Sequence, residues 1–106
     1  APIPRFRVRI PVGVSYKSDI ELVEKTLIEV ALKNKNVLVE PAPRARFRRF
    51  GDSDLQFELL CWTKEPALRG VTIHELNKAI YLAFAANGIQ IPFPQRDVHL
   101  FEEKKA

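Results

Sequence analysis

The residue types best suited to chemistry in this sequence are arginines that recur at alternate positions in two short segments. Seven of the 17 basic residues lie in these two segments, and neither segment contains an acid: Arg5, Arg7, Arg9, Arg44, Arg46, Arg48 and Arg49. Alternation of period two sends successive side chains to opposite faces of a β-strand, so each segment predicts a strand with one apolar and one basic face. Two such strands in one sheet form a basic open face of the kind that binds RNA. The candidate basic surface comprises Arg5, Arg7, Arg9, Arg44, Arg46 and Arg48.

Other reactive side chains form no recognisable catalytic or metal-binding set. His74 and His99 lack ligand spacing, so we expect no metal, no cofactor and no catalytic residue. The single cysteine, Cys61, cannot form an internal disulfide and reads as a buried strand thiol, which favours a reducing compartment. The sequence therefore predicts a protein that is not an enzyme.

Length and composition favour one ordinary globular domain. The chain has 106 residues with 46% hydrophobic and 28% charged residues and a net charge of +4. No apolar run approaches the roughly 20 residues that cross a bilayer as a helix. These residues are therefore expected to form a soluble domain.

The segment 55–64 is predicted to be the central strand of a sheet. Leu55, Phe57, Leu59 and Cys61 share one face, while Trp62 adds apolar surface to the other. Helices are expected on the Phe57 side. The strand 5–10 precedes Pro11 and Gly13, where we expect a bulge or an exit from the sheet edge.

Two helices are indicated by capping boxes that precede apolar residues at helical spacing. Ser18 and Glu21 begin a helix at 19–33, and Thr72 and Glu75 begin another at 73–87, after a connection at 65–70. Asn87-Gly88 is a stop signal for the second helix.

A hairpin is predicted between the strands 44–50 and 55–64. A three-residue loop, 51–53, pairs Phe47 with Phe57, Arg46 with Glu58, Arg48 with Gln56, and Phe50 with Asp54. A four-residue loop would instead oppose Phe47 to the charged Glu58, so we favour the shorter loop.

The resulting order, strand-helix-strand-strand-helix-strand, defines an α+β fold of the ferredoxin-like βαββαβ type, a mixed sheet with two helices on one face. Residues 1–94 form this domain, and residues 95–106 form a C-terminal strand and charged tail. Because Pro92 and Pro94 precede the last strand, at 97–101, that strand either completes the sheet or leaves it altogether.

Three motifs, in order, resemble the cytoplasmic C-terminal region of the small-conductance mechanosensitive ion channel family. They are the segments 7–19 (RVRIPVGVSYKSD), 50–59 (FGDSDLQFEL, followed by Trp62) and 87–98 (NGIQIPFPQRDV). The resemblance covers nearly the whole chain.

The resemblance implies a wall segment of a hollow cytoplasmic chamber on a channel that releases ions and small osmolytes during osmotic downshock. In that family seven subunits assemble, transmembrane and β domains precede this region, and the last strands form a small barrel. The partners implied are other copies of the chain, a heptamer, with an interface formed by Leu60, Trp62, Asp97, Val98, His99 and Leu100. The chain is thereby expected on the cytoplasmic side of a membrane, with roles in subunit assembly and solute filtering.

A basic ferredoxin-like nucleic-acid-binding module is the alternative. Sheets that bind RNA stack bases on aromatic side chains of the open face, whereas the predicted register turns Phe6 and Phe47 inward. The plainer interpretation of the arginines is a solvated face in which Arg46 pairs with Glu58, or a cationic surface inside an assembly.

Overall fold

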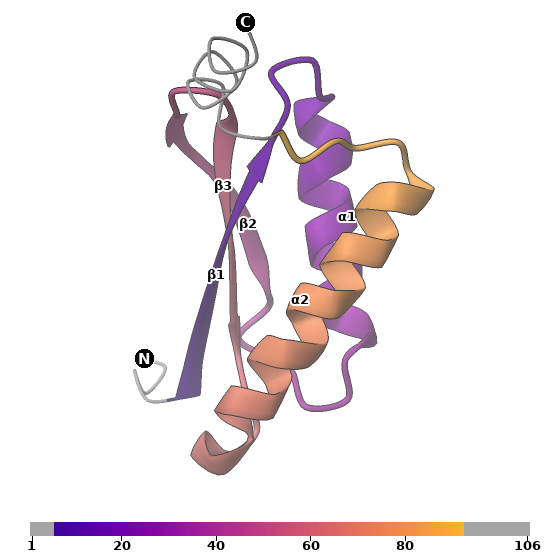
Figure 1. Cartoon of the computed structure of the whole chain (residues 1–106). Coiled ribbons are helices and arrows are strands. Elements are labelled where there is room, and N and C mark those ends of the chain that lie inside the picture. Colours follow the sequence, from indigo (N-terminus) through magenta and orange to yellow (C-terminus); the bar gives the residue numbers. More distant parts are fainter. Residues whose placement is uncertain (1–5, 93–106) are drawn as a thin grey trace, which may run out of the picture.

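The computed structural model describes residues 6–92, which form three strands and two α-helices. Their order along the chain is β1 (Arg7–Val14), α1 (Ile20–Lys33), β2 (Arg44–Phe50), β3 (Leu55–Trp62), the 3-10 turn η2 (Pro66–Leu68) and α2 (Arg69–Ala86). The sheet order is β1-β3-β2, and both helices cover the same face (Figure 1). The predicted α+β class is confirmed. Both described pairings are antiparallel, so the expected mixed sheet depends on the strand predicted at 97–101, which lies outside the described residues.

The central position predicted for the segment 55–64 is confirmed, because β3 pairs with both other strands. Its alternate residues Leu55, Phe57, Leu59 and Cys61 are buried and belong to one apolar cluster with both helices. The helices contribute Val23, Leu27, Val30 and Ala31 from α1, and Leu76, Ile80 and Phe84 from α2. One core therefore lies on one side of the sheet.

The first strand continues through Pro11 to Val14 in unbroken register with β3, so the bulge or edge exit predicted at Pro11 and Gly13 is wrong. Thr63 N donates to Phe6 O, and in an antiparallel ladder the hydrogen-bonded pairs alternate. Val8, Ile10 and Val12 therefore bond to β3. The backbone of Pro11 points to the outer edge of β1, where no described strand pairs with it, so its missing N–H costs no ladder bond within the described sheet. The strand continues because Pro11 lies at one of the alternate positions whose backbone N–H does not face β3.

One hydrogen bond at each end of β1 connects the outer edge of this strand to α2 or to the segment that follows α2. Arg69 Nε donates to Arg7 O (2.9 Å), and Ser15 N donates to Gln90 O (2.8 Å). These two contacts connect the beginning of α2 and the segment after it to the strand, and so fix the position of α2 along the sheet.

The hairpin has the predicted pairing at its base but a different turn. Phe47 lies opposite Phe57 and Arg46 opposite Glu58, as predicted, whereas Arg49 pairs with Gln56 and Phe50 with Leu55. The predicted pairs Arg48–Gln56 and Phe50–Asp54 are therefore wrong.

A four-residue loop closes this hairpin, and the register shift between Phe47 and Arg49 leaves Arg48 as the extra residue of a bulge. The loop and the bulge compensate each other, so Phe47 still stacks on Phe57 with ring centroids 5.0 Å apart.

Both predicted capping boxes differ from the structure. Asp19, not Ser18, caps α1 by accepting from Glu21 N and Leu22 N. The second helix begins at Arg69 after η2, so the predicted connection at 65–70 is wrong. Thr72 is buried inside the first turns of α2, and its hydroxyl has no hydrogen-bond partner among residues 6–92. The end of α2 is as predicted, because Gly88 has φ +71° and Ile89 N donates to Phe84 O.

The glycines of β1 and of the hairpin loop provide space for one carboxylate. A Cβ at Gly13 or at Gly51 would collide with the side chain of Asp54. Tyr16 Oη donates to Gly51 O, which ties the end of β1 to the β2–β3 loop. The two glycines, which leave room for Asp54, and the Tyr16 hydrogen bond together keep the end of β1 close to the β2–β3 loop.

Candidate functional site

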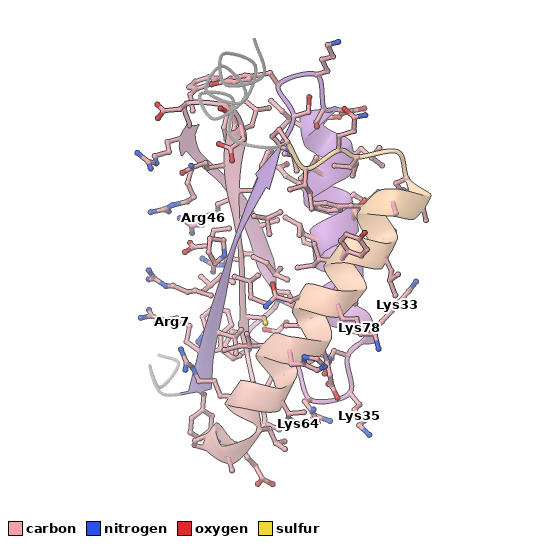
Figure 2. The ribbon with its side chains drawn as sticks, viewed as in Figure 1. Arg7, Lys33, Lys35, Arg46, Lys64 and Lys78 are labelled. Carbon is pink, nitrogen blue, oxygen red and sulfur yellow. The ribbon has the colours of Figure 1, made fainter. Side chains whose placement is uncertain are left out.

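The face of the sheet turned away from the helices carries most of the candidate functional residues. We call it the arginine face and define it by the outward side chains of Arg7, Arg9, Arg44, Arg46, Arg48 and Arg49, which flank Gln56, Glu58, Leu60 and Trp62 of β3. Figure 2 shows Arg7 and Arg46 directed away from the helix layer, with Lys33 and Lys78 on the opposite side of the molecule. The structure thus brings together the predicted basic residues that it describes. Arg5 lies outside the described residues.

The cross-strand register places the arginines of the two edge strands around the central strand. Arg9 and Arg44 both lie opposite Leu60, while Arg46 lies opposite Glu58. Like charges on neighbouring strands repel, and water plus an interposed neutral or acidic residue reduce that repulsion. This alternation explains how six arginines coexist on one small sheet.

Glu58 is the acid at the centre of the face, although its ion pairs differ from the predicted one. Its carboxylate contacts Arg9 Nη1 at 4.0 Å and Arg48 Nε at 3.9 Å. Arg46, which is directly opposite in register, makes no ion pair in the described part of the chain. The predicted Arg46–Glu58 ion pair is wrong, because the bulge brings Arg48 close to the same carboxylate.

Arg49 belongs to the face although strict alternation would place it with the inward residues Ala45 and Phe47. The bulge at Arg48 shifts the following residue by one position, and Arg49 Nε donates to Gln56 Oε1 at 2.8 Å. Two consecutive arginines thereby serve the same face. The one sign of the bulge in the sequence is the Arg48-Arg49 pair, which breaks the alternation of apolar and basic residues.

Two shallow hollows lie beside Asp54 and Gln56 at the end of the sheet. They measure about 370 Å³ and about 240 Å³, and Arg48, Arg49, Asp52, Gly13 and Glu58 contribute to their walls. Gln56 Nε2 donates to Asp54 Oδ1 at 3.4 Å. The walls mix both signs of charge, and the larger hollow includes Ser53, which is flanked in sequence by Asp52 and Asp54. Among the described residues no hydrogen bond joins the Ser53 hydroxyl to a base, so the hollow shows no activated nucleophile.

Leu60 and Trp62, the two predicted interface residues in the described part, differ in exposure. Trp62 is only 7% exposed within the single chain, and its carbonyl accepts from Leu38 N. Leu60 is half-buried. Trp62 therefore has little area left to bury against a neighbour. Asp97, Val98, His99 and Leu100 lie outside the described residues.

Open sheet faces that bind single-stranded RNA present aromatic side chains for base stacking. Among the described strand residues of the arginine face the sole aromatic is Trp62, which is buried. Phe47 is turned to the core side and stacks on Phe57. The described face therefore lacks a stacking platform.

The remaining candidates are isolated from one another. Within the described residues no group of three or more His, Cys, Asp or Glu side chains could hold a metal ion. His74 is exposed on α2. Glu75, predicted as a cap, instead accepts from Asn34 Nδ2 at 3.0 Å and so connects α2 to the end of α1.

Comparison with known proteins agrees with this geometry. The sequence pattern of the family described as "Mechanosensitive ion channel MscS, C-terminal" matches residues 8–91. The mechanosensitive channel MscK of Escherichia coli is 41% identical over 98 residues, which cover 92% of this chain and 9% of MscK. The small-conductance mechanosensitive channel of Edwardsiella ictaluri is 33% identical over 103 residues, covering 97% of this chain and 36% of that channel.

A solved structure is also similar. The crystal structure of Helicobacter pylori MscS in the closed state matches with a TM-score of 0.78 and 34% identity, over 84% of this chain and 35% of that one. The chain spans about a third or less of the length of these proteins. It belongs to the MscS mechanosensitive channel family and corresponds to its C-terminal domain. Among the described residues no helix is long and apolar enough to span a bilayer.

Cys61 provides a test of the packing beneath the arginine face. Its thiol is fully buried, and desolvation raises its pKa to about 11. The thiolate then forms more readily in the unfolded chain than in the folded one. Burial of the neutral thiol therefore makes its full contribution to the free energy of unfolding below about pH 9. That stability decreases as pH rises toward 11, by at most about 3 kcal/mol.

We expect chemical denaturation to show this decrease for the unmodified chain. The variant Cys61→Ala, less stable at neutral pH because of its cavity, should lack that part of the decrease. Parallel pH profiles for the two proteins between pH 8 and 11 would show that the thiol is not buried in the core.

Proposed function

We propose that this domain forms one wall segment of a cytoplasmic chamber of a small-conductance-type mechanosensitive channel. There it contributes to subunit assembly and filters solutes during the ion efflux that follows osmotic downshock. The observation that carries the proposal is the asymmetry of the sheet: two helices cover one face, and the other bears six described arginines, with Glu58 at its centre and Asp54 at one end. A wall needs one packed side and one side that faces solute.

The arginine face supports the filtering role through its electrostatic field. Arg9 and Arg48 have side chains that are 53% exposed, and Arg44, Arg46 and Arg49 are also exposed. A surface of one sign raises the local concentration of oppositely charged solutes, and screening limits the effect to about 8 Å at physiological salt. The face therefore favours anions in the water layer next to it.

The assembly role is supported by the resemblance and by the path of the chain after α2. Ser15 N, just after β1, donates a hydrogen bond to Gln90 O, and Pro92 lines the hollow beside the β2–β3 loop. This path crosses the end of the sheet and does not run along the open edge of β1. We propose that residues 95–106 pair with other copies of the chain, in the heptamer that the family resemblance implies, and that residues 1–94 form the wall.

The filtering role is tested by removing charge from the arginine face in the full-length parent channel. The triple variant Arg9→Gln, Arg46→Gln, Arg48→Gln should shift the reversal potential in a salt gradient toward lower anion permeability, and more so at low salt.

A matched control removes the same charge from the helix side with Lys25→Gln, Lys33→Gln and Lys78→Gln. Equal shifts in the two triple variants, or no shift in either, would count against filtering by this face.

The assembly role is tested by deleting residues 97–106 from the parent channel. We expect a smaller fraction of full oligomer in detergent, measured by native mass, because the deleted segment is proposed to supply contacts between subunits. Unchanged oligomer yield, together with unchanged channel activity in patches, would contradict the role proposed for the tail.

A further inference from the structure

The centre of the arginine face contains one carboxylate that holds two arginines from different strands. Glu58 lies on β3, with Oε2 directed at Arg9 of β1 and Oε1 at Arg48 of β2, at 4.0 and 3.9 Å. Arg46 of β2 lies opposite Glu58 in register. Two guanidinium groups thus lie beside one acid, whose two oxygens are each directed at a different arginine, and Arg46 is the cross-strand neighbour of the same acid.

These contacts hold the arginines loosely. Both distances exceed the range of a hydrogen bond, so the attraction is Coulombic without a directed N–H···O bond. In the described chain the side chains of Arg9, Arg46 and Arg48 donate no hydrogen bond, and those of Arg9 and Arg48 are 53% exposed. The side chain of Glu58 is only 17% exposed. The acid is therefore fixed in the sheet surface, while the donors of the arginines remain available above it.

We propose that Arg9, Arg46 and Arg48 form a binding site for small oxyanions, and that Glu58 is a built-in competitor that keeps this site weak. A carboxylate and a phosphate present the same kind of oxygen acceptors to guanidinium forks. The Glu58 carboxylate lies between Arg9 and Arg48 and attracts both, at 4.0 and 3.9 Å, without taking up their hydrogen-bond donors. An external oxyanion reaches these donors from the solvent side, and the fixed negative charge of Glu58 repels it.

This inference rests on the proposed function, because it names the solutes that the arginine face attracts. It adds a limit on how tightly those solutes bind, since weak binding lets an anion pass along the face without being retained. A face of six arginines without Glu58 would hold multivalent anions longer, as clustered guanidinium groups do in phosphate-binding sites.

The size of the effect follows from Coulomb's law. Removing one charge about 6 Å from a divalent anion at a surface, with partial screening, changes the affinity by about three- to tenfold at low salt. Glu58→Gln should therefore tighten phosphate binding by this factor, and Arg46→Gln should weaken it by a similar one. The fold should persist in both, because glutamine nearly matches the shape of Glu58, whose ion pairs lack hydrogen bonds, and because Arg46 is exposed.

The experiment is a titration of the 106-residue chain with inorganic phosphate at constant low ionic strength. Binding is followed through the Nε–Hε signals of the arginines in ¹H–¹⁵N spectra, which report on the guanidinium groups themselves. Glu29→Gln is the matched control: it removes the same charge from the exposed surface of α1, in the helix layer behind the sheet, and should leave the phosphate affinity unchanged.

The outcomes separate this inference from the proposed function. Tighter binding in Glu58→Gln, weaker binding in Arg46→Gln and no change in Glu29→Gln support it. If Arg46→Gln weakens binding while Glu58→Gln leaves it unchanged, the competitor role is overturned and the anion-attracting face stands. If phosphate shifts none of the three arginine signals up to tens of millimolar, both the site and the anion preference of the face are contradicted.

Discussion

Burial of only one face of a three-stranded sheet is the constraint on which the rest of this structure depends. Every second residue of β3 enters a core shared with two helices, so the intervening residues must point to the other side. An arginine at a core position would lose its hydration without a partner, at a cost of several kcal/mol. The arginines of β1 and β2 therefore select which face of each strand meets the helices, and the open charged face is a direct consequence of the packed one.

The structure also explains the residue types in one of the motifs that carry the family resemblance. In the segment RVRIPVGVSY, Pro11 tolerates strand pairing because its nitrogen faces the open edge, and Gly13 leaves room for Asp54. Tyr16 then reaches the carbonyl of Gly51 in the hairpin loop. Each of these residue types satisfies a local steric or hydrogen-bonding requirement of the sheet. That end also carries Pro92, where the chain crosses the strand ends.

Features that depend on burial and periodicity could be predicted from the sequence. The central strand, the apolar stripes of both helices and the Phe47–Phe57 pairing follow from alternation and from the cost of opposing Phe47 to Glu58. The Gly88 stop follows from its freedom at positive φ.

The errors share a different origin. A bulge at Arg48, a cap at Asp19 and the beginning of α2 at Arg69 each depend on a choice between local geometries of similar energy, which the surrounding packing decides. The bulge also decided the site, because it brought Arg48 to Glu58 and Arg49 onto the arginine face. An alternation rule cannot foresee a residue that interrupts the alternation.

The central claim is that the uncovered face of the sheet presents a positive field to water. Its most direct measurement compares relaxation of backbone amides caused by two paramagnetic probes of the same size, one anionic and one cationic, at low salt. The amides around Arg46 and Glu58 should relax faster with the anionic probe, whereas that of Glu29 on α1 should show little difference. Equal effects of the two probes at Arg46, or a stronger effect of the cationic one, would contradict the account.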